Sequence, residues 1–144
     1  TLTGHVSIYD FDMLIGDYKV SDVPTALGHV NALQTHFVWA DPESTHLNLL
    51  DIVTGENHVI ADLDGKYAQY YLLSHDASLA MAINVDFEPV IVAWDTQTGE
   101  RYDLGAYRTC ARIPDKTKLS ADGTTLIIGC NTGFELWRIV DHTD

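Results

Sequence analysis

Short apolar runs alternate with tight polar turns along most of this chain. From residue 36 onward the runs are about five to seven residues long, the usual length of a β-strand. Two of them, Val90–Trp94 and Leu126–Ile128, are apolar at every position, whereas a strand with one solvated face alternates. The pattern therefore predicts an all-β protein whose antiparallel sheets are covered on both faces. The predicted strands read HFVWA, HLNLLDI, NHVIADL, YAQYYLL, LAMAI, PVIVAW, TLIIGC and FELWRIV.

The segment before residue 36 is less regular. HVSIYDF predicts one strand and DMLIGDYKV another beside it. In Ser21–His36 the apolar residues Leu27, Val30 and Leu33 have helical spacing, so a helix is one alternative. A glycine and several β-branched residues weaken the helix, and we favour a strand near Thr25–Ala32.

The same unit recurs at nearly constant spacing. Four strands end at pairs that precede a polar turn, and these pairs lie 41, 44 and 43 residues apart. The pairs are Tyr9-Asp10, Leu50-Asp51, Trp94-Asp95 and Trp137-Arg138. A period of this length with four short strands per unit is typical of β-propeller blades.

Two of the units resemble WD-repeat propeller blades. One carries Ser120-Ala121-Asp122-Gly123, LIIG, Gly133 and Leu136-Trp137; the other carries Ser74-His75-Asp76, Ala93-Trp94-Asp95 and Thr98-Gly99-Glu100. Gly28-His29 stands ahead of the unit that ends at Asp51, as the family's pattern implies. Ala82 and Ile128 stand where the family has a Ser or Thr, so the related YVTN and TolB-like repeats remain alternatives.

The chain length fits three to four such units. We interpret residues 1–144 as a single partial propeller, with units ending near Asp10, Asp51, Asp95 and Arg138 and an incomplete blade at each end. Incomplete blades expose strand edges, which native proteins avoid. We therefore expect the ring to be closed by the remaining blades of a larger chain or by other subunits.

The charge of the chain excludes some partner classes. The formal net charge is -13, which repels phosphate and argues against nucleic acid and anionic membranes as partners. No apolar run reaches the length of a membrane span, and we expect a cytoplasmic protein. The two cysteines, Cys110 and Cys130, do not form a metal-binding motif, and we interpret them as two separate buried thiols.

Several residue combinations suggest chemistry, but each has a structural explanation. Ser74-His75-Asp76 has the residue types of a catalytic triad, yet sequence neighbours rarely converge as a triad does, so a turn is expected. Asp62-Leu63-Asp64-Gly65 resembles the start of a calcium loop, but Leu73 stands where a Glu is needed. Asp51 and His58 are expected to face each other across a hairpin as a charge pair. We expect no catalytic residue, no cofactor and no metal site.

The acidic loops carry the functional hypothesis. The resemblance implies that loops between second and third strands share one face with the connections between blades, where propellers often bind partners. This face would carry Asp41, Glu43, Asp62, Asp64, Asp86, Phe87 and Glu88, with Lys66 and Arg108 nearby. An acidic rim around one aromatic residue suits a basic segment of another protein. We expect a non-catalytic scaffold or protein-interaction module; the alternative is the propeller portion of a larger enzyme, such as the gating domain of a peptidase.

Overall fold

The computed structural model describes most of the chain. The described residues are 4–10, 13–21, 27–31, 33, 35–41, 43, 45–108, 116–120, 122–130 and 132–139, with the backbone alone described at 4–10, 13–21, 27, 30 and 116. All regular secondary structure in the described residues is β-strand. These residues therefore contain no helix that could cross a membrane. The expected all-β class is confirmed.

The strands form four antiparallel sheets, which we number in chain order. Sheet I pairs β1 (Gly4–Asp10) with β2 (Met13–Ser21). Sheet II contains β3 (Leu27–Val30), β4 (His36–Ala40), β5 (His46–Asp51) and β6 (Asn57–Asp62). Sheet III contains β7 (Ala68–Leu73), β8 (Leu79–Val85), β9 (Glu88–Asp95) and β10 (Arg101–Ala106). Sheet IV contains β11 (Lys116–Leu119), β12 (Thr125–Cys130) and β13 (Gly133–Arg138).

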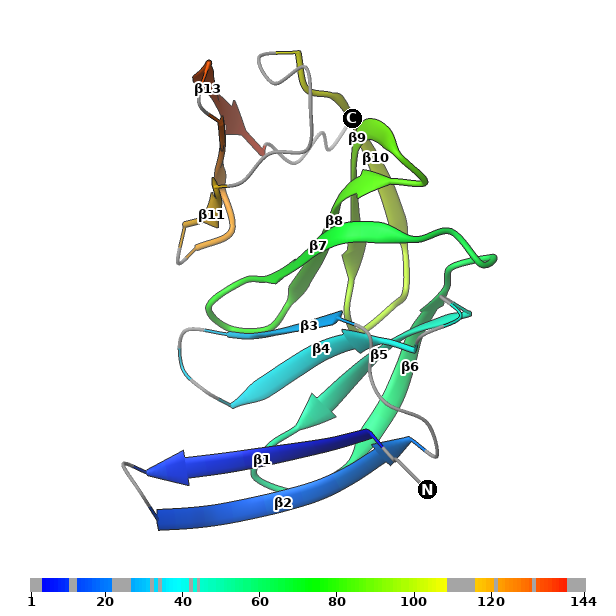
Figure 1. Cartoon of the computed structure of the whole chain (residues 1–144), viewed down its shortest axis with the longest axis vertical. Helices are drawn as coiled ribbons and strands as arrows, with labels where there is room; N and C mark the ends of the chain where they lie inside the picture. Colours follow the sequence, from blue (N-terminus) through cyan, green and yellow to red (C-terminus); the bar gives the residue numbers. More distant parts are fainter. Residues whose placement is uncertain are drawn as a thin grey trace.

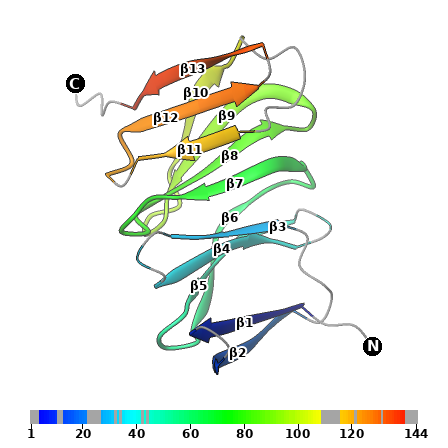
Figure 2. The same ribbon diagram turned by 60° about the vertical axis from the view of Figure 1, so that its left-hand side comes forward.

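Every hydrogen-bonded neighbour in a sheet is also a neighbour in sequence. Figures 1 and 2 show the sheets stacked in chain order, with the first strands β3, β7 and β11 lying side by side. The described part of the segment with two alternatives contains a strand: β3 lies inside the predicted range Thr25–Ala32. Residues 22–26, 32 and 34 of this segment lie outside the described residues.

Two apolar cores lie between successive sheets. The first joins sheets II and III and contains Val38, Leu49, Leu73, Ala80 and Trp94, among others. The second joins the opposite face of sheet III to sheet IV. Because neighbouring residues of a strand point to opposite faces, a strand between two cores must be apolar throughout. This confirms the prediction from Val90–Trp94 that the sheet is covered on both sides.

The expected pairing of Asp51 with His58 is wrong. His58 lies opposite Leu49, because the turn holds four residues between Asp51 and Glu56, whose backbone N–H and C=O meet at 2.8 Å. The Asp51 carboxylate accepts hydrogen bonds from two amides of its own turn, and His58 Nε2 lies 3.4 Å from the carbonyl oxygen of Thr96 in the next sheet.

The interpretation of Cys130 as a separate thiol is also wrong. Cys130 is disulfide-bonded, at the end of β12. The other cysteine of the chain, Cys110, lies outside the described residues.

Candidate functional site

Three loops that the sequence predicts on one face do lie together. The Leu63 amide donates to the Thr45 carbonyl at 2.9 Å, which ties the β6–β7 connection to the β4–β5 loop. The Asp86 amide donates to the Tyr67 carbonyl at 2.6 Å, which ties the β8–β9 turn to the same connection. We call the predicted residues of these three joined loops the acidic rim: Asp41, Glu43, Asp62, Asp64, Asp86, Phe87 and Glu88.

The carboxylates of the acidic rim are not equivalent. Asp41 is partly buried, which opposes ionisation, but hydrogen bonds from the Thr45 hydroxyl and from the His46 and Thr45 amides outweigh this and lower its pKa. Asp62 accepts the amide of Asp64 at 2.8 Å, in the manner of an Asx turn. Both carboxylates thus shape their own loops, whereas Asp86 and Glu88 are exposed.

Phe87 stands at the tip of a strained turn. Val85 pairs with Glu88, so Asp86 and Phe87 form a two-residue hairpin turn, and their φ angles are 53° and 62°. This is the type I′ conformation, which normally selects Asn-Gly. A left-handed φ costs an ordinary L-residue about 1–2 kcal/mol. The Phe87 side chain is nevertheless 78% exposed, and its ring stacks on Tyr67 at a centroid distance of 6.2 Å.

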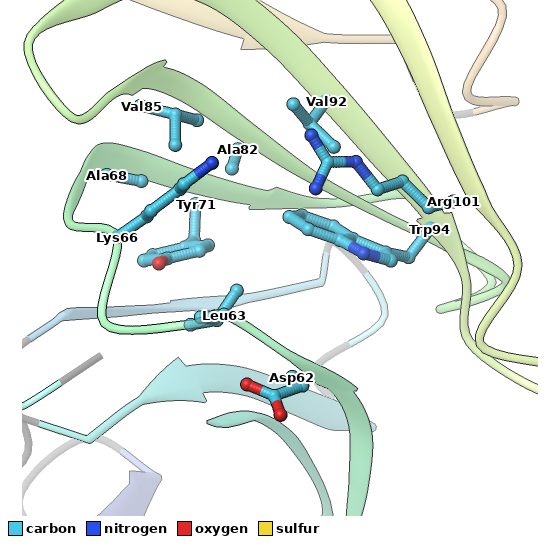
Figure 3. Close-up of a pocket in the computed structure, with 10 residues that line it drawn as sticks. All are labelled: Asp62, Leu63, Lys66, Ala68, Tyr71, Ala82, Val85, Val92, Trp94 and Arg101. Carbon is cyan, nitrogen blue, oxygen red and sulfur yellow. The ribbon is translucent and has the colours of Figure 1, made fainter. Parts of the chain in front are cut away.

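Beside the rim, a groove opens over the edge of sheet III. It has a volume of ≈ 420 Å³, and Lys66, Asp86, Glu88, Arg101 and Asp103 are the charged residues that line it. A smaller cavity of ≈ 20 Å³ lies between sheets II and III and shares Lys66, Val85, Val92 and Arg101 with the groove. Figure 3 shows Lys66 and Arg101 reaching over this cavity from opposite sides, with the rings of Tyr71 and Trp94 beneath them.

Arg101 is the residue that the sequence reasoning missed. It begins β10 and pairs across the hairpin with Trp94. A turn centred on Thr98-Gly99 would have put Asp103 opposite Trp94, so the turn residues alone did not indicate Arg101. Its guanidinium makes two hydrogen bonds to Asp103, of 2.8 and 3.1 Å. The backbone amide of Arg108, which was expected near the rim, donates to the Glu135 carboxylate on β13 at 2.6 Å.

The triad-like residues form a turn, as expected. Asp76 accepts hydrogen bonds from the Ser74 and Ser78 hydroxyls and from the Ser78 amide, and these bonds lower its pKa. The Ser74 oxygen in turn accepts the Leu79 amide at 3.0 Å. Asp122 makes the same pattern with Ser120 and Thr124 in the β11–β12 turn. Among the described side chains, no three His, Cys, Asp or Glu residues gather closely enough to hold a metal ion.

Comparison with known proteins identifies the architecture. No family model and no curated protein matches the sequence. The structure is similar to that of the tricorn protease, with a TM-score of 0.61 and 14% identity over 86% of this chain. It is also similar to hydrazine synthase of Kuenenia stuttgartiensis, with a TM-score of 0.61 and 20% identity over 86% of this chain. Both proteins contain β-propeller domains.

This chain is built of β-propeller blades. It spans 13% of the tricorn protease chain and 35% of the hydrazine synthase chain. At these identities the likeness concerns the fold alone. Sheets II and III are blades of four strands, sheet IV has three described strands, and the structure shows no closed ring. The acidic rim and the groove lie where the β6–β7 connection between two blades meets the β8–β9 turn of the second.

Proposed function

We propose that this chain is a non-catalytic protein-interaction module, and that the acidic rim around Phe87 is its partner-binding surface. The proposal rests on one observation: a large aromatic side chain is held in solvent by a backbone conformation that disfavours it. Backbone strain of this kind is found mainly at functional sites. We propose that the repeat is of the WD type or of the related YVTN or TolB-like types.

The surroundings of Phe87 define the partner that would bind best. Exposed aromatic residues are common anchors of interfaces, because they bury a large area and lose little conformational entropy. Asp86 and Glu88 flank the ring, and the chain as a whole carries a net charge of -13. A Lys or Arg side chain can pair with either carboxylate while it packs on the face of the ring. The expected partner is therefore a basic segment of another protein.

A displayed library of random short peptides tests this proposal. Selection on the wild-type chain is expected to enrich peptides rich in Lys and Arg, and the enriched pool should bind weakly to Phe87→Ala and to Asp86→Lys. Phe134→Ala is the matched control, because it removes a ring that is 72% exposed on a different blade. A selected pool that binds both rim variants as well as it binds the wild type would sink the proposal.

A second candidate is the propeller portion of a larger enzyme, and sheet IV favours it. On β12 and β13, Ile127 lies opposite Leu136, and these side chains are 41% and 65% exposed. The corresponding pairs, Val38 with Leu49 and Met81 with Ala93, are buried against the next sheet. No described residue thus covers the equivalent face of sheet IV, and we propose that a further blade of the parent chain or another subunit covers it. The parent sequence would reveal a catalytic domain, and a mass in solution several times 16.0 kDa would reveal subunits.

The disulfide at Cys130 bears on where the protein acts. Stable disulfides are rare in the reducing cytosol and common in secreted or periplasmic proteins. We therefore propose an oxidising compartment in place of the cytoplasm expected from the sequence. Thiol titration of the unfolded, unreduced chain should find no free cysteine; two free thiols would restore the cytoplasmic interpretation.

A further inference from the structure

Two cationic side chains converge over the cavity of an otherwise acidic protein. The chain has 8 Lys and Arg residues against 21 Asp and Glu residues. Lys66 comes from the connection between sheets II and III, and Arg101 from the start of β10, yet both line the cavity and the groove. Figure 3 shows their charged ends pointing toward each other above Tyr71 and Trp94. The two positive charges repel each other at short range, and an anion placed between them would attract both.

The floor of the cavity carries an unpartnered donor. Tyr71 lines the cavity, and only 4% of the residue is exposed. Its hydroxyl makes no hydrogen bond with any residue that the structure describes. A buried hydroxyl without a partner is costly, and native proteins rarely leave one so. The ≈ 20 Å³ of space beside it suits one oxygen atom, since a single water needs about 10–15 Å³ by this measure.

We propose that Lys66, Arg101 and the Tyr71 hydroxyl form a binding site for a carboxylate group of a peptide. One carboxylate oxygen enters the small cavity and accepts the Tyr71 hydroxyl, while the rest of the peptide lies in the groove outside. Trp94 forms the apolar wall against which the neighbouring carbon atoms pack.

The protonation state of Tyr71 agrees with this assignment. Burial, and after it the charge of Asp41 and the neighbouring Tyr67, raise the pKa of Tyr71 well above its usual value. The hydroxyl therefore keeps its proton at neutral pH and can donate a hydrogen bond to an anion.

The charge balance selects a carboxylate over a phosphate. Asp62 lines the small cavity, and Asp86, Glu88 and Asp103 line the groove. These groups repel a doubly charged phosphate more strongly than a singly charged carboxylate. Arg101 already donates from Nε and Nη2 to one carboxylate oxygen, Oδ1 of Asp103, so its guanidinium binds a carboxylate in this place.

Three short peptides would test the site by the NMR signals of the tryptophan indole N–H groups. One peptide carries a glutamate side chain and a C-terminal amide, the second a glutamine and a free C-terminal carboxylate, and the third a glutamine and an amide. Either acidic peptide should shift the Trp94 signal in the millimolar range and leave Trp39, whose indole N–H is bound to Asn57, unchanged. Which of the two is stronger identifies the source of the carboxylate.

Variants separate this site from the proposed rim function. Lys66→Met and Arg101→Met should each weaken the acidic peptides about tenfold, the cost of losing one charge-assisted hydrogen bond. Tyr71→Phe should weaken them less, and Arg138→Met, an exposed charge on another blade, should change nothing. The response should persist in Phe87→Ala, so that the rim proposal can fail while this one stands. Equal shifts from the neutral peptide, or shifts that survive in the Lys66→Met/Arg101→Met double variant, would overturn the assignment.

Discussion

The strained turn at Phe87 makes a prediction that reverses a common rule. Alanine normally stabilises a protein relative to glycine by about 0.5–1 kcal/mol, because glycine loses more backbone entropy on folding. At φ 62° the alanine keeps the left-handed penalty of about 1–2 kcal/mol, which glycine does not have. Both substitutions remove the phenyl ring and its contact with Tyr67 equally. Phe87→Gly should therefore be more stable than Phe87→Ala by roughly 0.5–1 kcal/mol.

Urea denaturation of the two variants measures this difference directly. The midpoints should differ in favour of glycine with no change of slope, since the same surface is exposed on unfolding. In a thermal melt the gap corresponds to about 2–4 °C for a chain of this size. The wild type should lie close to both, because the stacking of Phe87 on Tyr67, about 0.5–1 kcal/mol, offsets part of its strain. An alanine variant that equals or exceeds the glycine variant would refute the left-handed turn and, with it, the strain on which the proposed function rests.

Three further outcomes are expected from the structure. Gly99→Ala should destabilise the chain more than Gly65→Ala, by about 1–3 kcal/mol in urea denaturation. The two φ angles are nearly equal, 74° and 73°, but a Cβ on Gly99 would lie 2.7 Å from the Ile60 carbonyl oxygen, whereas the nearest described atom to a Cβ on Gly65 is 4.0 Å away. Tyr71→Phe should raise the free energy of unfolding by about 1 kcal/mol in the same assay, because it removes a buried hydroxyl that has no partner among the described residues. A fall in the free energy of unfolding by more than that amount would show that the hydroxyl has a partner. Hydrogen bonds from the Thr124 and Ser120 hydroxyls lower the pKa of Asp122 to about 2 from 3.8. The stability that Asp122 contributes is therefore full above pH 3.8 and is lost as the pH falls toward 2. The melting temperature should depend less on pH across this window in Asp122→Asn than in the wild type, and an equal dependence in both would contradict the assignment.

The sequence predicts the sheets better than the site, for a physical reason. The fully apolar run Val90–Trp94 predicts a strand between two cores because burial on both faces leaves no position for a polar side chain. The turns at Asp76 and Asp122 can be predicted equally well from the sequence, because the hydrogen bonds of each aspartate go to residues within two positions of it.

Features that depend on distant or subtle geometry were not predictable in the same way. The pairing of His58 shifted by two residues because the turn after Asp51 holds four residues, and the sequence alone does not set that number. The meeting of Lys66 and Arg101 requires knowing how two blades are placed against each other. That the Tyr71 hydroxyl has no hydrogen-bond partner among the described residues depends on the three-dimensional packing around it, because its place in the sequence is that of an ordinary tyrosine in a strand.

The sequential order of the strands has a consequence for how such chains change over evolutionary time. All strand pairing in the described residues joins consecutive strands, so no backbone ladder crosses from one sheet to the next. Sheets meet mainly through side chains, together with a few loop hydrogen bonds. Duplication or deletion of one whole unit would therefore break no hydrogen-bond ladder. It would change only which two sheets pack their apolar faces against each other. Ring size in this architecture can then vary by gene duplication, with side-chain repacking at a single junction as the structural cost.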